Sequence, residues 1–547
     1  MLHNVKSLLI STLSFLTFLF LIYCVFLHYS IGDNPWIFYN ADSVYLPYLY
    51  RDLFQKGGTI SEWIFSPTPY FFPDMLIYFF IAFIVSHLKL AIILFATIQL
   101  ALYYYFIVAI GSKIISNPNQ ISLFQISVLI SLLLLANGYF KQETLDMAMT
   151  SQAHFGTALM FLLGTLLILK TFSSDNLSNF IFLFLVCLLT VFSDLVFLTQ
   201  FIAPVILSLV IMLIIYPNPI FRFTCIKNII AILTGSLLSY IIYQNQFFYL
   251  NIDIYTNPLK RLAFDQLLAG IKKIGLTFEI YYHTNSFVSI LWITFFILSC
   301  LILTSVIFHH RKKNRHSESF LFVTILLFLS IVLGFFSLLF LDNNLMVDNY
   351  YKLRHSISYI IFPVFLGIPT ILSRCGETIT KWIPPVSLIS IFAITVTAYI
   401  TKANGQINHI LNFYPKSIAC LDSFVEKYHF QNGITDYYRE GKSNNFLSKK
   451  NLNIVTLKHT PTQRLVPRFY FNTSHDYNKK NFYFILTNRS HQIDTEFYQN
   501  TTKENLIKQF GNPQFEFICP SWNKKQNTIY VYPNGIRSLI NNREKSS

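Results

Sequence analysis

Charged residues are scarce in this chain of 547 residues. Only 12% of the residues are Asp, Glu, Lys or Arg and 53% are hydrophobic, whereas roughly a quarter of an ordinary soluble domain is charged. A disordered chain needs many charges and few apolar residues, so this class is excluded. A cytosolic enzyme made of several soluble domains, which the length alone would suggest, is excluded by the same shortage.

Cysteine and glycine are also scarce, with 7 and 18 residues. So few cysteines exclude a disulfide scaffold, and their spacing matches no metal site. The short loops predicted to face inward contain no glycine-rich motif that cradles phosphate. Cys420 and Cys519 are the only cysteines after residue 402. They form a disulfide if this part of the chain lies on an oxidising side of a membrane, and otherwise they are two buried free thiols.

Long apolar runs are abundant, at the length of about 20 residues that crosses a bilayer as a helix. The first runs from Met1 to His28, and we expect it to remain as an uncleaved helix because it is too long for a signal peptide. Ten further spans are predicted, at 89–112, 121–139, 155–172, 178–196, 198–216, 226–244, 287–309, 319–341, 355–373 and 382–401. The sequence therefore predicts a polytopic α-helical membrane module over residues 1–401, with about eleven transmembrane helices.

Basic residues mark one side of the predicted bundle. If the N-terminus is cytoplasmic, all the basic loops face inward: they lie at Lys113, Lys170, Arg222/Lys227, His309–Arg315 and Arg374/Lys381. Lys and Arg resist translocation, so this agreement fixes the predicted orientation. The polar segments 30–74, 140–154, 245–286 and 342–354 then face outward, as does the chain after residue 402. We call residues 30–74 the first outer loop.

Two other segments are predicted to lie along the membrane surface. The apolar run from Met75 to His87 has 13 residues, which is too short to cross and favours an interfacial or re-entrant helix. Pro258 to Ile274 alternates apolar and basic residues at helical spacing, as a surface helix does. A plain connector is the alternative for this second segment.

Residues 402–547 are predicted to form a small extracytoplasmic α/β domain. Helices are expected at 415–428 and 502–510, and strands at 453–457, 482–487, 515–519 and 528–532. This part has 20 Lys and Arg against 10 Asp and Glu, and so carries most of the net charge of +15. With no arginine-rich tract or nucleic-acid module, we interpret the charge as attraction to membrane lipids and predict no nucleic-acid partner.

The first outer loop contains the best candidates for chemistry, Asp42, Asp52 and Asp74. Partial burial near a membrane raises the pKa of a carboxylate towards neutral pH, where it can act as a general base or bind a metal. Asp42 precedes a helical pattern that starts at Val44, so capping that helix is an alternative role.

Two further candidates lie at helix ends. His154 stands beside Gly156 at the start of one predicted span. Asp194 lies at the outer end of another span, where an ionisable group is costly. For each residue, a role in a site and a position at the exposed membrane interface are both open.

The order of these features resembles the GT-C membrane glycosyltransferases, notably the branch with bacterial aminoarabinose transferases and protein mannosyltransferases. A first helix leads to an outer loop with an early Asp, a glycine turn, an aromatic and proline-rich stretch, an interfacial helix and a span that ends in a basic loop. The resemblance implies transfer of a sugar from a polyprenyl-phosphate donor to an envelope glycan, lipid or protein, with Asp42 catalytic. The family's adjacent Asp-Glu pair is Asp42-Ser43 here, so Asp52 or Asp74 would supply the second carboxylate.

The resemblance also implies binding residues. The stretch from Tyr350 to Pro363 resembles the family's Arg-Tyr…Pro segment, in which Arg354 would hold the lipid phosphate through a bidentate fork. Its neighbours Lys352 and His355 would assist, although interfacial snorkelling is an alternative for the basic residues. Acceptor or sugar would be positioned by Asp146, His154 and Asp194. A divalent cation, Mg²⁺ or Mn²⁺, bound at Asp42 is the alternative to a role as base.

Two other classes of function are compatible with a chain that has many predicted transmembrane helices. A transporter or lipid flippase predicts matching interrupted helices in two halves, and we find no internal repeat. A non-catalytic scaffold predicts that Asp42 and Arg354 tolerate substitution, whereas truncation after Lys402 abolishes function. Abundant Ile, Phe, Lys and Asn suggest an AT-rich bacterial genome, and we expect the chain in the bacterial inner (cell) membrane.

Overall fold

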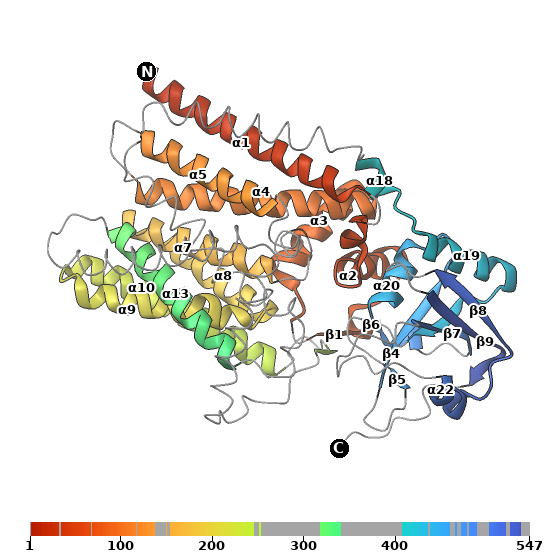
Figure 1. The fold of residues 1–547 in the computed structure, drawn as a ribbon. Helices are drawn as coiled ribbons and strands as arrows, with labels where there is room; N and C mark the ends of the chain where they lie inside the picture. Colours follow the sequence, from red (N-terminus) through yellow and green to blue (C-terminus); the bar gives the residue numbers. More distant parts are fainter. Residues whose placement is uncertain are drawn as a thin grey trace.

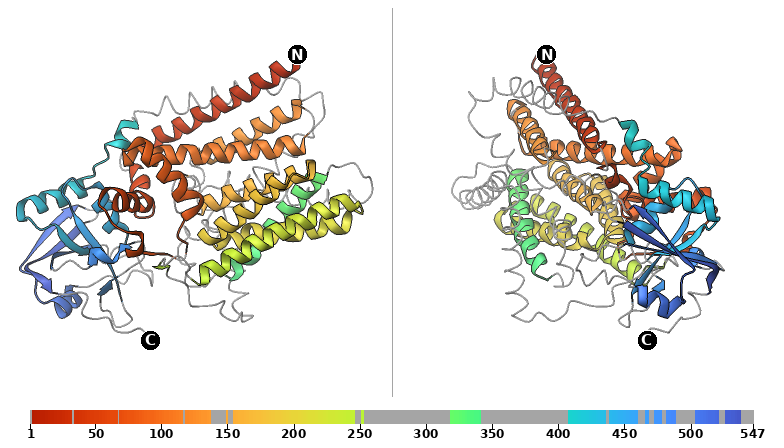
Figure 2. Two further views of the ribbon diagram at one scale, coloured as in Figure 1. Left: turned by 180° about the vertical axis from the view of Figure 1, so that it is seen from behind. Right: turned by 45° about the vertical axis from the view of Figure 1, so that its right-hand side comes forward.

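The computed structural model describes residues 2–31, 34–66, 68–115, 118–136, 149, 154–245, 251–252, 318–340, 407–435, 438–459, 465–467, 472–477, 481–488, 503–520 and 526–537, and the following statements concern these residues. Most of them are helical. The helices form one apolar bundle, and a small sheet domain lies at the end of the bundle where α1 finishes (Figures 1 and 2). We call this the outer end, because the first outer loop lies there.

The bundle contains helices at eight of the eleven predicted spans. They are α1 (Leu2–Tyr29), α4 (Leu88–Ile114), α5 (Pro118–Ala136), α7 (Phe155–Ser173), α8 (Leu177–Ser193), η5 with α9 (Leu198–Ile202, Ala203–Ile215), α10 (Pro219–Gln244) and α13 (Glu318–Phe340). The predicted spans 287–309, 355–373 and 382–401 lie outside the described residues. Four of the described helices are long and apolar enough to cross a membrane, by length and composition: α4, α7, η5–α9 and α10. The structure is thus compatible with a membrane protein, while the number of eleven crossings stays a prediction.

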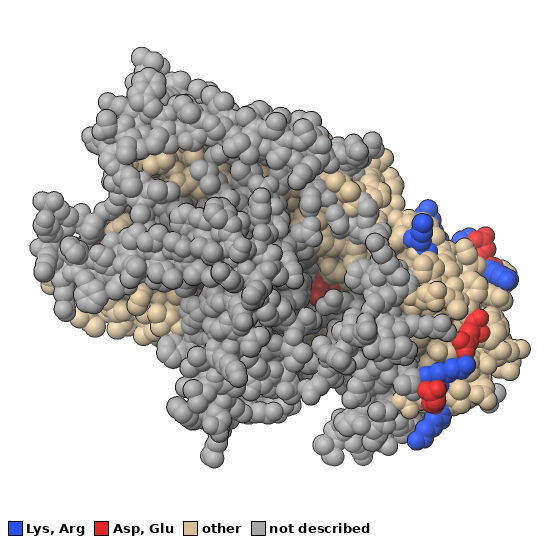
Figure 3. Space-filling model, in the orientation of Figure 1, with Lys and Arg blue, Asp and Glu red and all other residues tan. Residues whose placement is uncertain are grey.

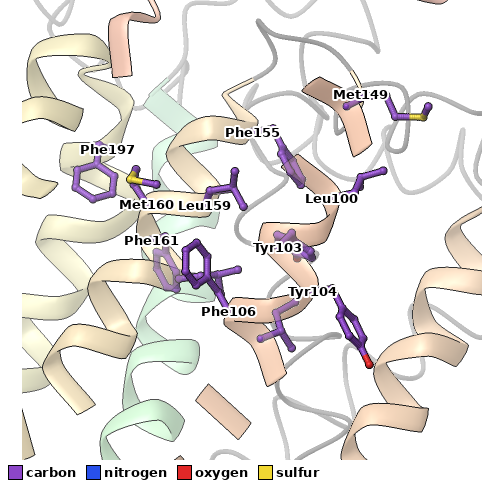
Figure 4. Packing of buried hydrophobic residues seen from close by; sticks show 14 of the residues in the cluster. Leu100, Tyr103, Tyr104, Phe106, Met149, Phe155, Leu159, Met160, Phe161 and Phe197 are labelled. Atoms are coloured by element: carbon purple, nitrogen blue, oxygen red, sulfur yellow. The ribbon is translucent and has the colours of Figure 1, made fainter. Parts of the chain in front are cut away.

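The helices pack side by side, both with the next helix in the chain, as α7 does with α8, and with a later one, as α4 does with α7 and α8 with α10. Gly235 of α10 lies against the carbonyl oxygen of Phe184 in α8, so that any larger residue would separate the two helices. Such small residues allow the close backbone approach typical of packing in a membrane. Aromatic rings fill the space between α4 and α7, where Tyr103 packs against Phe155 (Figure 4).

The short apolar run after the first outer loop forms the predicted short helix. It starts as a π-helical turn, η4 (Phe71–Met75), continues as α3 (Leu76–Val85) and ends at Ser86, which has a left-handed backbone. Phe80 and Phe83 are 66% and 77% exposed on its outer face. This apolar face suits a helix at the lipid interface, and its position in a membrane stays a prediction. The predicted surface helix at 258–274 lies outside the described residues.

The first outer loop is compact. It contains η1 (Asn34–Tyr39), α2 (Tyr45–Tyr50), η2 (Arg51–Gln55), η3 (Ile60–Glu62) and β1 (Trp63–Phe65). All six residues of α2 are buried, although α2 belongs to a loop. Capping by Asp42, the alternative role for this residue, is wrong for α2: Val44 occupies the N-cap position, and no side chain caps the helix.

The C-terminal domain has a mixed sheet of six strands in the order β5-β4-β3-β7-β9-β8. The strands are β3 (Asn432–Thr435), β4 (Asn453–His459), β5 (Leu465–Pro467), β7 (Asn481–Asn488), β8 (Phe515–Pro520) and β9 (Gln526–Arg537); the helices are α18 (Ile407–Leu411), α19 (Lys416–Tyr428), α20 (Tyr438–Leu447), α21 (Ser474–Tyr477) and α22 (Lys503–Phe510). The two predicted helices and four predicted strands are confirmed. Alternate strand residues enter two apolar cores, with Ile485 in one and Phe484 in the other, as expected for a sheet buried on both faces.

Cys420 and Cys519 form a disulfide that joins α19 to edge strand β8, with 5.7 Å between their Cα atoms. Of the two alternatives open from the sequence, the disulfide is therefore the one observed. On the face drawn in Figure 3, the described charged residues gather on the C-terminal domain at the right.

The C-terminal domain is docked on the first outer loop. Strand β1 pairs with β6 (Asn472–Thr473) on one side and with β2 (Asn251–Ile252) on the other. The guanidinium of Arg51 lies 5.0 Å from the ring of Tyr48 and 5.6 Å from that of Phe446 in α20. Three of the segments that the sequence predicts on one side of the membrane therefore meet at one end of the bundle.

Candidate functional site

Three buried titratable side chains meet at the outer end of the bundle. Asp74 ends the first outer loop, His154 precedes α7, and Asp194 follows α8. Their exposed fractions are 4%, 7% and 2%. For His154 and Asp194, the alternative of an exposed interfacial position is therefore wrong. We call these three residues the acid cluster.

His154 and Asp194 form the tightest contact of the acid cluster. Nδ1 of His154 lies 2.5 Å from Oδ2 of Asp194, and the hydroxyl of Thr157 donates to the same oxygen at 2.6 Å. The backbone N–H of Val196 donates to the other carboxylate oxygen at 3.0 Å. Hydrogen bonds to both oxygens favour the charged carboxylate and hold the turn that joins α8 to η5.

Asp74 has a different environment. Its carboxylate packs so closely on α7 that a Cβ added at Gly156 would overlap it. The N–H of Phe72, two residues earlier, donates to the hydroxyl of Ser193 at 2.9 Å, which fixes this end of the loop on α8. Burial, reinforced by repulsion from Asp194, raises the pKa of Asp74 well above its ordinary value. The two carboxylates are thus driven towards opposite protonation states, a pattern found where one acid must exchange a proton.

One residue of the acid cluster, His154, and one residue beside the cluster, Tyr70, have an unusual backbone. Tyr70 and His154 have φ angles of 58° and 57°, in the left-handed region that side chains other than glycine rarely adopt. Their ring centroids are 5.8 Å apart. Backbone strain of this kind is costly and concentrates at functional sites, so these two turns support a site between the first outer loop and α7.

The other two aspartates of the first outer loop lie in different surroundings. Asp52 accepts a hydrogen bond from the indole N–H of Trp63 at 2.7 Å and packs on Gly58, so it holds the loop together. Asp42 is half-buried at the turn before α2, where its backbone N–H donates to the side chain of Asn40 at 3.0 Å. The site roles assigned to both residues stay predictions.

The remaining predicted binding residues, Asp146, Lys352, Arg354 and His355, lie outside the described residues. Within the described part of the chain, no three His, Cys, Asp or Glu side chains are arranged to hold a metal ion. The side chains of the acid cluster can exchange protons and form hydrogen bonds.

Sequence reasoning did not single out Thr157 or Ser193 as site residues. Thr157 stands three residues after His154, so both side chains fall on one face of the first turn of α7. Ser193 is the residue before Asp194. The sequence signal that could have identified both residues is that each lies within three positions of an ionisable residue at a helix end, His154 or Asp194.

No protein-family model matches the chain, and no curated protein is significantly similar to it. The function is therefore argued from the site and from the order of the sequence features.

Proposed function

We propose that the protein is an integral-membrane glycosyltransferase that moves a sugar from a polyprenyl-phosphate donor to an envelope glycan, lipid or protein on the outer face of the membrane. The observation that carries the proposal is the buried Asp74 beside the His154–Asp194 pair, where the first outer loop meets the apolar helices. A donor with a lipid tail and a polar head needs a site at such a boundary. The resemblance in feature order supports the same reaction.

The reaction requires one base and one group that stabilises the leaving phosphate. An acceptor oxygen attacks the anomeric carbon, the bond from that carbon to the phosphate oxygen breaks, and the acceptor proton passes to a carboxylate. Once ionised, Asp74 is a stronger base than an ordinary aspartate because its pKa is raised, and this favours Asp74 as the base, whereas the resemblance assigns Asp42. Arg354, with Lys352 or His355, would stabilise the departing phosphate, which keeps the electron pair.

His154 and Asp194 would then position the acceptor or the sugar. Thr157 fixes the carboxylate of Asp194 from the first turn of α7. A hydrogen-bonded pair on rigid helix ends is suited to orient a substrate, because little reorganisation is needed when the substrate binds.

The proposed location is the bacterial cell membrane, with a cytoplasmic N-terminus and the C-terminal domain outside. The Cys420–Cys519 disulfide supports this orientation, since disulfides persist in extracytoplasmic compartments and are rare in the cytosol. The inward-facing basic loops support it independently.

One observation favours a second candidate, a proton-coupled transporter or lipid flippase. A buried His–Asp pair beside another carboxylate at the end of apolar helices also suits a proton relay. The two candidates differ in one product, because a transporter makes no glycosidic bond.

The test is mass spectrometry of envelope glycolipids and surface glycans from a deletion strain. The strain is rescued with wild-type protein, with Asp74→Asn, with Asp42→Asn or with Asp175→Asn, at matched protein levels. Asp175 lies at the other end of α8 and is 50% exposed, so Asp175→Asn should restore the wild-type profile.

We expect the deletion and Asp74→Asn to lose one sugar and to accumulate the acceptor without it. If Asp42→Asn loses this sugar and Asp74→Asn does not, Asp42 is the base instead of Asp74. Unchanged glycans in the deletion strain would reject the transferase and leave a transporter or a non-catalytic scaffold as the remaining candidates.

A further inference from the structure

Gln99 is a buried amide that the proposed reaction has not used. It lies in the middle of α4 with 1% of its surface exposed. In the structure as described, neither its amide nitrogen nor its amide oxygen has a hydrogen-bond partner. Leaving a buried polar group unsatisfied costs stability, and each such group in a native protein calls for an explanation.

The neighbours of Gln99 on α4 show which way its side chain faces. Residues four apart share one face of a helix. Four residues before Gln99, the ring of Phe95 lies 6.0 Å from Tyr78 of α3. Four residues after it, the ring of Tyr103 lies 5.2 Å from Phe155, the first residue of α7 (Figure 4). Gln99 therefore faces the region between α3 and the start of α7.

The acid cluster lies at the same two places. Asp74 is two residues before α3, His154 is the residue before Phe155, and the Asp74 carboxylate packs on Gly156 of α7. The unsatisfied amide and the buried carboxylate thus come from different helices and border one region of the site.

We infer that Gln99 and Asp74 form the subsite for the ring of the transferred sugar, and that this sugar is uncharged. A side-chain amide offers one acceptor and two donors in a plane, which matches two adjacent hydroxyl groups of a sugar. The carboxylate of Asp194, which lies beside Asp74, repels an anionic sugar such as a uronic acid. The inference rests on the proposed glycosyl transfer, in which Asp74 reaches the same sugar.

The test uses full-length protein in detergent and uncharged methyl glycosides of glucose, mannose and galactose, with methyl glucuronide as the anionic probe. Binding is measured as a rise in melting temperature with sugar concentration. The variants are Gln99→Leu, the near-isosteric Gln99→Glu, and Gln125→Leu as a matched control, because Gln125 is a glutamine of α5 that is 4% exposed.

We expect at least one uncharged glycoside, and not the glucuronide, to stabilise wild-type protein and Gln125→Leu. Gln99→Leu should bind that glycoside roughly 10- to 100-fold more weakly, as expected for two lost hydrogen bonds. Without sugar, Gln99→Leu should be at least as stable as the wild type, because an unsatisfied group has been removed.

The inference is overturned if Gln99→Leu and Gln99→Glu bind like the wild type, if the glucuronide binds best, or if no glycoside binds. It is also overturned if Gln99→Leu unfolds more easily than the wild type without sugar, since Gln99 would then be structural. If sugar binding depends on Gln99 but glycans are unchanged in the deletion strain, the sugar subsite is supported and the proposed glycosyl transfer is rejected.

Discussion

At each end of helix α8 an aspartate is paired with a nitrogen-containing side chain, and the two pairs differ in burial. Before its first turn, Asp175 contacts Lys227 of α10 at 2.6 Å, and the two side chains are 50% and 33% exposed. After its last turn, Asp194 contacts His154 at 2.5 Å, and the side chains are 2% and 7% exposed. The separations are nearly equal, so the two pairs differ in the partner of the aspartate, Lys227 or His154, and in their burial.

The difference indicates which end of the bundle carries chemistry. An exposed pair gains little because water already solvates both charges. A buried pair has lost that solvation, and hydrogen bonds to the carboxylate must replace it. Asp194 receives them from Thr157 and Val196, and a second acid, Asp74, lies beside it. A protein that needed only a stable helix end would not keep two buried carboxylates there.

Asp194→Ala should have the largest effect on stability. It removes the carboxylate from His154, Thr157 and the N–H of Val196, and breaking a buried pair by removing one partner costs roughly 3–5 kcal/mol. The free energy of unfolding in detergent measures this cost. Asp194→Asn, which keeps one oxygen as acceptor, is the control and should lose less. Equal stability of Asp194→Ala and the wild type would remove the distinction between the two ends.

The double variant Cys420→Ser/Cys519→Ser should lose about 2–4 kcal/mol, because the disulfide closes a long loop in the unfolded chain. The residues are 99 positions apart. Limited proteolysis can monitor unfolding of the C-terminal domain and so measure the loss of stability. A reducing agent should cause the same loss of stability in wild-type protein. Alkylation of both cysteines in intact, unreduced cells would contradict an oxidising surrounding for this end of the molecule.

Gly156→Ala should cost roughly 1–3 kcal/mol, because its Cβ would displace the Asp74 carboxylate from α7. Gly111→Ala is the matched control: its Cβ would meet the ring of Phe124 in α5 instead. Both variants should melt at lower temperature than the wild type, whereas only Gly156→Ala should lose sugar transfer per folded molecule. Equal sugar transfer by both variants would show that the acid cluster takes no part in the reaction.

Asp175→Ala should have the smallest effect, within about 0.5 kcal/mol of wild type. The pair is exposed, and salt screens what attraction it has. Thermal unfolding at low and high ionic strength is the check. A loss as large as that of Asp194→Ala would mean that burial does not separate the two pairs.

Local pattern was sufficient to predict most elements. Apolar runs predicted α1, α3, α4, α5, α7, α8, α9, α10 and α13, and β-branched and aromatic runs predicted β4, β7, β8 and β9. The pairing of β1 with β6 could not be predicted, because it joins Trp63 to Thr473 through strands of only three and two residues. Such short strands carry no periodic signal.

The site could be predicted in part. The cost of an ionisable residue at a helix end pointed to His154 and Asp194, but their burial depends on a contact between residues 40 positions apart. The environment of Asp74 depends on Gly156 in another helix, which no local pattern reveals. The disulfide was undecided for the same reason, because sequence gives the residue types and not the distances between them.

Whether Asp74 is kept for chemistry at a cost in stability can be measured by thermal unfolding of Asp74→Asn and wild-type protein from pH 4 to 8. The pKa of Asp74 is raised in the folded protein, so wild-type stability should fall as pH rises from the ordinary aspartate value of about 3.9 towards the raised pKa. Asparagine does not titrate. We therefore predict that Asp74→Asn is more stable than the wild type at pH 7, with a difference that shrinks towards pH 4. A variant less stable than the wild type at pH 7 would contradict the account, because the Asp74 carboxylate would then hold the fold together.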